Sequence, residues 1–236
     1  MAFRFAIGAG HYLGTAGRRI PKALDKNLTK EWELNDRVVR YVIQAAEKYE
    51  GLEIMRLDDP TGYNAISVES RCDSANIWGA NFCAEIHHDA YTGKPWNGGG
   101  MTAFCAVGNK DGKQYRDAIY AAAIAAGGLR GNRATPKQEK DWTFCKKNAA
   151  PAVLLECGFM DSKVDAPVIL TEEYAKAVGY AIMDGIAQIA GLKKKPEKET
   201  LYCVQVGAFK NKDYAVEMLK KLKSAGFDGY ITEKEN

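Results

Sequence analysis

The chain has 236 residues, 46% of them hydrophobic, which is enough for one domain with a substantial core and a small additional module. The formal net charge of +3 comes from 33 basic and 30 acidic residues, so we expect no basic surface that binds nucleic acid. No apolar run approaches the ~18 residues of a membrane span, and the first apolar run is too short for a signal peptide.

Apolar runs typical of strands alternate with segments of helical period along residues 1–191. Strands are expected near residues 3–10, 53–57, 82–88, 101–107 and 151–159. Helices are expected near residues 29–49, 71–79, 115–126 and 171–190. In the last helix Thr171 is the candidate N-cap, and Gly191 follows the final turn. This alternation predicts an α/β fold with a mostly parallel, twisted sheet and helices on both faces.

The C-terminal part of the chain differs in composition. Residues 192–200 are charged and contain Pro196, so they are predicted to be a linker. The pattern then restarts in residues 201–236, with a strand at 202–206, a helix around 214–222 and a strand at 229–232. These 36 residues predict a small β-α-β module, below the size that usually folds alone without a disulfide or a metal.

The predicted helix at 29–49 allows a geometric test of its acidic residues. At 100° per residue, Glu31 and Asn35 continue the apolar stripe of the helix, whereas Glu33 lies on the opposite face. A carboxylate that points toward the core needs a partner, because burying it unpaired costs several kcal/mol. The helix alone leaves two partners open for Glu31, an arginine such as Arg71 and a metal ion.

The stretch AEIHHDA at residues 84–90 contains two of the three histidines of the chain. Side chains alternate along a strand, so His87 shares a face with Glu85 while His88 points the other way. Taken singly, each histidine is more often a hydrogen-bonded structural residue than a metal ligand. The residues at the neighbouring strand ends make a metal ligand the better interpretation.

His11, His87 and Glu156 each lie near the end of a predicted strand, so they are expected to meet at one edge of the sheet. Two imidazoles and one carboxylate with an open fourth position suit a catalytic Zn²⁺ ion. A second carboxylate, free of the metal, could take a proton from water and return it to a leaving amine. For Glu156 an ion pair with Lys146 or Arg71 stays open, although a charge within an apolar strand favours a functional site.

Four motifs, in this order, resemble the zinc-dependent N-acetylmuramoyl-L-alanine amidases of bacteria and their phages. They are AIGAGH at 6–11, EWELN at 31–35, ESRCDSAN followed by AEIHHDA at 69–90, and APAVLLECGFMDS at 150–162. The resemblance runs from about residue 2 to residue 189 and implies an α/β catalytic domain with one Zn²⁺ ion. It assigns the metal to His11, Glu31 and His87, and catalysis to Glu156.

The same resemblance implies hydrolysis of the amide bond between N-acetylmuramic acid and L-alanine in peptidoglycan, with Glu156 as base and then as acid. Candidate substrate contacts are Asn35, Arg71, Asn76 and Asp89. The chain departs from the usual motif where Ser and Asn are common, because it reads Glu-Ile-His-His-Asp-Ala at 85–90. The ligand types themselves match.

The tail resembles the beginning of a SPOR domain, a peptidoglycan-binding module. The expected layout is therefore a zinc amidase domain at 1–191, a linker at 192–200 and a partial SPOR-like module at 201–236. We expect peptidoglycan as partner and action on the bacterial cell wall, after synthesis in the cytoplasm and release by host or mother-cell lysis. Two alternatives stay open, a zinc peptidase that cuts within the stem peptide and a non-catalytic wall-binding protein.

Overall fold

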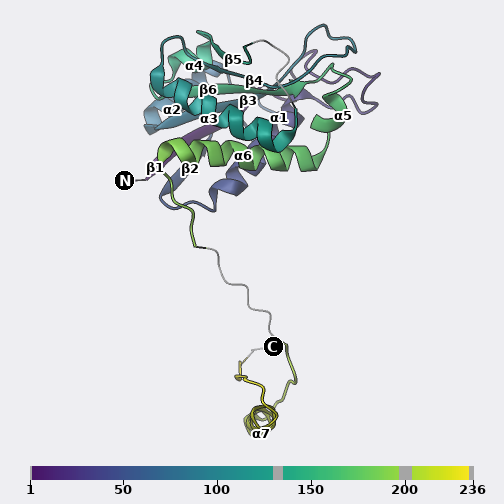
Figure 1. Cartoon of the computed structure of the whole chain (residues 1–236), viewed down its shortest axis with the longest axis vertical. Helices are drawn as coiled ribbons and strands as arrows, with labels where there is room; N and C mark the ends of the chain where they lie inside the picture. The colour runs from purple at the N-terminus through teal and green to yellow at the C-terminus, as the bar shows by residue number, and fades with distance from the viewer. Residues whose placement is uncertain (1, 130–134, 197–203, 234–236) are drawn as a thin grey trace. The chain divides into compact units, whose positions relative to one another are not determined.

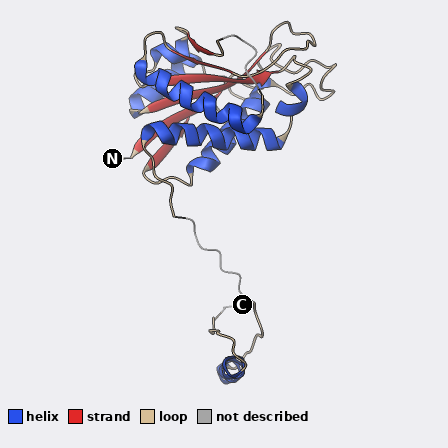
Figure 2. Cartoon of the chain, viewed as in Figure 1, coloured by secondary structure: helices blue, strands red, loops and turns tan. Residues whose placement is uncertain are grey.

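The computed structural model describes residues 2–129, 135–196 and 204–233. The chain divides into two compact units, Met1–Lys195 and Pro196–Asn236, and each is described by itself. The first unit is a six-stranded sheet covered by helices (Figures 1 and 2). In the described ranges, every helix is too short or too polar to cross a lipid bilayer.

The sheet is mostly parallel, as predicted. Its strands are β1 (Phe3–Ala9), β2 (Leu52–Arg56), β3 (Phe82–Asp89), β4 (Thr102–Cys105), β5 (Lys137–Glu139) and β6 (Ala152–Phe159). They are ordered β2-β1-β3-β6-β4-β5, and the first four run parallel. β4 is antiparallel to β6, and β5 is parallel to β4. The sequence did not predict β5, which has only three residues and no alternating pattern.

The four predicted helices are present, and two short ones are added. The helices of the first unit are α1 (Glu31–Ala46), α2 (Val68–Trp78), α3 (Lys110–Gly127), α4 (Thr143–Lys147), α5 (Ala166–Ile169) and α6 (Glu172–Ala190). The Thr171 hydroxyl accepts from Tyr174 N–H at the start of α6, and Gly191 ends the helix in the left-handed conformation, which confirms both caps. Helices α4 and α5 are too short to show a helical period.

Helices cover both faces of the sheet, and the alternation along β1 shows how. Phe5 and Ile7 belong to the large core cluster formed with α1, α3 and α6, and α3 and α6 lie side by side (Figure 1). Ala6 points to the other face and joins a smaller cluster with Cys72 of α2 and Phe144 of α4. A strand buried on both faces reads as a continuous apolar run, which is the pattern of FAIGA at residues 5–9.

The edge at which β1, β3 and β6 end carries the candidate site. The three strands are neighbours and parallel, so their carboxyl ends lie together. His87 of β3 is the register partner of Glu156 of β6, and the register shifts between His87 and Asp89. His11 follows the end of β1 by two residues. The predicted convergence of these side chains at one edge is therefore confirmed.

The segment 193–195, expected to be the start of the linker, is instead part of the first unit. Lys195 N–H donates to Lys48 O at 2.7 Å, Glu50 N–H donates to Lys193 O at 2.9 Å, and Lys194 forms a bridge with Tyr49. Charged side chains do not prevent this pairing, because the bonds involve only backbone groups while the lysine side chains stay at the surface.

The second unit contains α7 (Lys212–Ser224), where the tail was predicted to be helical. The side chains of α7 include none that is buried. The described residues 204–211 and 225–233 form no strand, so the expected β-α-β pattern is not confirmed in them. Part of the first expected strand, including Tyr202, lies outside the described residues. An alternating segment becomes a strand only when a second segment pairs with it.

Candidate metal centre

Glu31 is the first residue of α1 and points inward. Its side chain is 1% exposed, whereas Glu33 is exposed and accepts a hydrogen bond from Lys30 N–H at the start of the helix. The helical geometry had predicted this difference between the two glutamates, and the structure confirms it. A buried carboxylate is thus placed at the edge where β1 and β3 end.

His11 follows β1 in a left-handed backbone conformation, with φ of 65°. A non-glycine residue in this region costs about 1–3 kcal/mol and persists only when its surroundings hold it. Here Arg71 Nη2 donates to His11 O at 3.0 Å, and Gly10 N–H donates to Ile86 O at 2.8 Å. These bonds fix the strained turn that brings the His11 imidazole toward Glu31.

The His87 ring lies directly against Gly10. A Cβ atom on residue 10 would overlap the imidazole, so the glycine of GAGH is required for the ring to occupy this position. His87 Nδ1 is 3.0 Å from Glu31 Oε1, and His87 Nε2 is 3.3 Å from Glu85 Oε2. The imidazole is therefore held between two carboxylates, one on each ring nitrogen.

The three predicted metal ligands come together. His11 Nε2 is 3.3 Å from Glu31 Oε2, and one candidate ligand atom from each of His11, Glu31 and His87 lies within 4.8 Å of the others. The two imidazole rings are 5.0 Å apart and nearly perpendicular. Glu31 Oε2 is buried and makes no hydrogen bond within the described part of the chain. This donor set and the orphaned oxygen fit a divalent ion such as Zn²⁺.

The charges of this cluster support one another. Burial alone would raise the pKa of Glu31, but the neighbouring imidazoles of His11 and His87 lower it well below its ordinary value. Burial likewise opposes the charge on His87, yet its carboxylate neighbours, first Glu31 and then Glu85, raise its pKa well above the ordinary value. Glu31 is therefore kept ionised, which a metal ligand must be.

The sequence left open an ion pair between Glu31 and Arg71, and this prediction is wrong. Arg71 Nη1 instead binds Glu85 Oε1 at 2.8 Å. The arginine near Glu31 is Arg18, whose Nη1 is 3.7 Å from Oε2 and whose side chain is half exposed. Such a long contact from an exposed arginine does not replace a ligand for the buried carboxylate.

Glu156 lies in the second half of β6, in register with His87, and has no ion-pair partner in the described residues. Its Oε2 atom is buried without a hydrogen bond. Burial, opposed by the charge of His87 and assisted by Asp89 and Glu31, raises the pKa of Glu156 to about 8. Lys146, one expected partner, pairs with Asp141 instead. Glu156 is thus a carboxyl group that can hold or release a proton near neutral pH.

His88 has a structural position, on the face opposite His87. Its Nδ1 is 2.7 Å from Asn35 Oδ1, and Asn35 Nδ2 donates to Gly10 O at 3.0 Å. Burial lowers the pKa of His88 to about 3, so the ring is neutral. Both histidines follow the predicted alternation, and the buried Asn35 amide is used within the fold.

The other predicted substrate contacts lie in different surroundings. Asn76 Nδ2 donates to Lys147 O, and its Oδ1 accepts from Ala149 N–H, so this amide joins α2 to residues 147–149. Asn76 is not among the residues that line the cavity described below. Asp89 ends β3 and raises the pKa of Glu156, which places it near the catalytic candidate.

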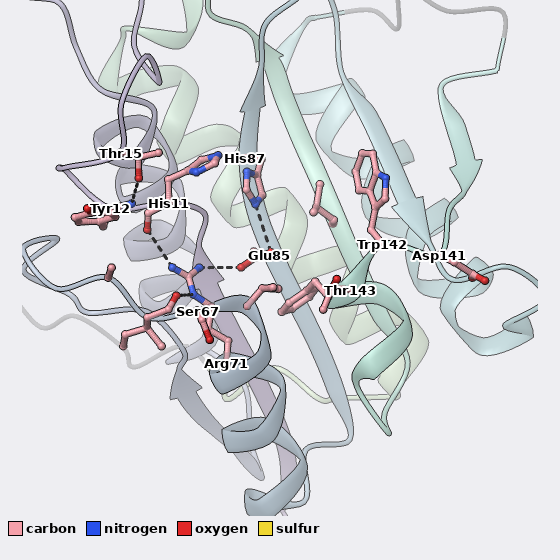
Figure 3. A pocket seen from close by; sticks show the side chains of 15 residues that line it. His11, Tyr12, Thr15, Ser67, Arg71, Glu85, His87, Asp141, Trp142 and Thr143 are labelled. Atoms are coloured by element: carbon pink, nitrogen blue, oxygen red, sulfur yellow. Dashed lines mark hydrogen bonds and ion pairs between the residues drawn. The ribbon is translucent and has the colours of Figure 1, made fainter.

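A cavity of about 740 Å³ opens next to the histidines (Figure 3). His11, Glu85 and His87 line one part of it, and the segment Asp141 to Phe144 lines another. Trp142 is 41% exposed, with its ring against Phe104. A role for Glu85 was not predicted from the sequence, although its position on the same strand face as His87 indicated one.

The fold and the site together define an α/β domain with a candidate single-metal centre at the carboxyl edge of its sheet. The sequence profile of the Amidase_3 family, N-acetylmuramoyl-L-alanine amidase, matches residues 6–188. The chain belongs to this family. The profile of the SPOR domain matches residues 198–236.

Characterised relatives and solved structures agree with this assignment. The chain is 28% identical to the sporulation-specific N-acetylmuramoyl-L-alanine amidase of Bacillus subtilis, over 97% of this chain and 84% of the relative. It is 26% identical to N-acetylmuramoyl-L-alanine amidase CwlM of Bacillus licheniformis, over 98% and 85%. The crystal structure of the N-acetylmuramoyl-L-alanine amidase from Clostridium difficile 630 has the same fold, with a TM-score of 0.72, 19% identity, and coverage of 80% of this chain and 97% of that one.

Proposed function

We propose that the protein is a zinc-dependent amidase that hydrolyses the amide bond between N-acetylmuramic acid and L-alanine in peptidoglycan. In this proposal His11, Glu31 and His87 hold one Zn²⁺ ion, and Glu156 is the general base and then the general acid. One observation carries it most directly. Two carboxylates lie at the same edge of the sheet; Glu31 contacts both His11 and His87, whereas Glu156 Oε2 has no hydrogen-bond partner among the described residues.

The residues divide the chemistry between them. A zinc ion at this site would supply a Lewis acid that polarises the scissile carbonyl and makes water more acidic. Glu156 accepts a proton from the attacking water and delivers it to the leaving nitrogen of L-alanine. In the metal-free protein burial raises the pKa of this carboxyl group, and a nearby zinc ion would lower it again, which favours a group that can take up and release a proton.

The cavity beside the histidines is the proposed place for the substrate. Tyr12 and Trp142 give it aromatic surfaces on which a sugar ring or an apolar part of a peptide can lie. Asp89 remains a proposed substrate contact because of its place near Glu156. The match of the tail to a SPOR domain supports a second contact with peptidoglycan and action on the cell wall.

Mass spectrometry of digested peptidoglycan tests this proposal. The protein loaded with zinc is incubated with purified sacculi, and the Glu156→Gln variant is the control. We expect glycan strands without peptide together with stem peptides that begin with L-alanine. Glycan that keeps part of its peptide would instead show a peptidase that cuts within the stem. Sacculi left intact, with binding retained, would show a non-catalytic wall-binding protein.

A further inference from the structure

The Arg71 side chain joins the elements that carry the two histidine ligands. It is 4% exposed and lies on the first half of α2. Its Nη1 donates to Ala9 O at 2.7 Å, its Nη2 donates to His11 O at 3.0 Å, and its Nε donates to Ile66 O at 3.1 Å. The guanidinium therefore fixes the backbone at the end of β1, where His11 has its strained conformation.

The remaining contact of Arg71 leads to the other histidine. Nη1 also donates to Glu85 Oε1 at 2.8 Å, and Glu85 Oε2 lies 3.3 Å from His87 Nε2 (Figure 3). Glu85 and His87 are two residues apart on one face of β3, so both side chains point to the same side of the sheet. One carboxylate thus connects the arginine to the imidazole.

We propose that Arg71 and Glu85 form a positioning pair for the metal centre. Glu85 accepts a hydrogen bond from His87 Nε2–H and so directs Nδ1 toward Glu31. The Arg71 guanidinium neutralises the buried Glu85 carboxylate and, through Nη2, also holds the carbonyl of His11. The proposal rests on the zinc site of the proposed function, and neither residue needs to touch the substrate.

General physical chemistry favours this role over simple stabilisation. A buried ion pair contributes little net stability, because both charges lose their hydration, and an apolar pair of similar volume is often as stable. A carboxylate bonded to the second nitrogen of a metal-binding histidine, by contrast, fixes the tautomer and the orientation of the ring. Glu85 lies where such a carboxylate acts, and both of its oxygens are engaged.

The test uses two double variants that both remove the buried charges. Single variants would leave one charge buried without its partner and would fold poorly. Arg71→Met with Glu85→Gln keeps an acceptor for His87 Nε2–H, whereas Arg71→Met with Glu85→Leu removes it. The zinc dissociation constant is measured by competition with a chelating dye, and thermal melting of the metal-free protein reports the fold. Asp73→Asn with Lys147→Met, which removes a surface ion pair between α2 and α4, is the control.

We expect the Leu double variant to bind zinc roughly 10–100-fold more weakly than the wild type, which is the usual cost of losing such a partner. The Gln double variant should recover part of this loss, and the control should match the wild type. With Co²⁺ in place of zinc, the visible absorption spectrum should change most in the Leu variant. A Leu variant that melts like the wild type and binds zinc equally well would overturn the positioning role alone. A wild-type protein without zinc affinity would overturn the metal site and this role together.

Discussion

Helix α1 and strand β6 each place a carboxylate at the same edge of the sheet, but the surroundings of the two carboxylates have opposite effects on their pKa values. Glu31 has an imidazole nitrogen near each oxygen, and its pKa is lowered. Glu156 has a buried oxygen that no described residue hydrogen-bonds, and burial raises its pKa to about 8. Partners, more than burial, thus separate a residue that stays ionised as a ligand from one that carries a proton.

The largest effect is expected from Glu31→Gln, which removes the charge from the partnered carboxylate. Zinc affinity should fall by more than the roughly 100-fold that loss of an outer partner costs, and hydrolysis of sacculi should fall to background. Glu33→Gln is the matched control, because this exposed glutamate lies in the same turn of α1. Titration with zinc and release of soluble peptide check both variants. If Glu31→Gln bound zinc as tightly as the wild type, Glu31 would not be a metal ligand, and its proposed difference from Glu156 would be contradicted.

Glu156→Gln tests the second carboxylate, the proposed general base. The amide cannot take a proton from water, so kcat should fall by roughly 10²–10⁴. Bound zinc should stay at one ion per chain, because Glu156 is not a ligand in this account. Elemental analysis and initial rates on the same preparation measure both properties. A rate equal to that of the wild type would exclude Glu156 as the base.

Zinc itself should stabilise the fold, since the ligands come from β1, α1 and β3. At a free zinc concentration 100 times the dissociation constant, stabilisation is about 2.7 kcal/mol. For a domain of this size that corresponds to a melting temperature roughly 5–10 °C higher than in the presence of a chelator. Glu156→Gln should keep this increase and Glu31→Gln should lose it. Equal increases in the two variants would place the ion elsewhere.

The smallest predicted effect concerns pH and the metal-free protein. Because burial raises the pKa of Glu156 from 4.5 to about 8, its protonated form stabilises the fold fully below pH 4.5, and this contribution is lost as the pH rises to 8. Glu156→Gln cannot ionise, so its free energy of unfolding should exceed that of the wild type by a margin that grows as the pH rises toward 8. Urea unfolding at pH 5 and pH 8 measures the difference. A difference that does not grow with pH would show that the carboxyl has an ordinary pKa.

The comparison also shows how far the sequence leads. Helical geometry separated Glu31 from Glu33, and strand alternation separated His87 from His88, because both depend only on local periodicity. The edge at which they meet followed from the parallel order of the strands.

Tertiary contacts account for what the sequence did not predict. The bond from Arg71 to Glu85 joins α2 to β3, and nothing in either segment alone indicates the pairing. Trp142 lines the cavity from the N-cap of α4, and this helix is too short to show a helical period in the sequence. Residues 193–195 joined the first unit through backbone bonds to 48–50, although their charge had suggested a linker.

Anomalous diffraction at the zinc absorption edge, from crystals of the zinc-loaded protein, tests the central claim most directly. The account predicts one peak bonded to the side chains of His11, Glu31 and His87 at about 2.0–2.2 Å, with the Glu156 carboxylate outside bonding distance. A peak bonded to Glu156, or one that does not touch Glu31, would contradict it.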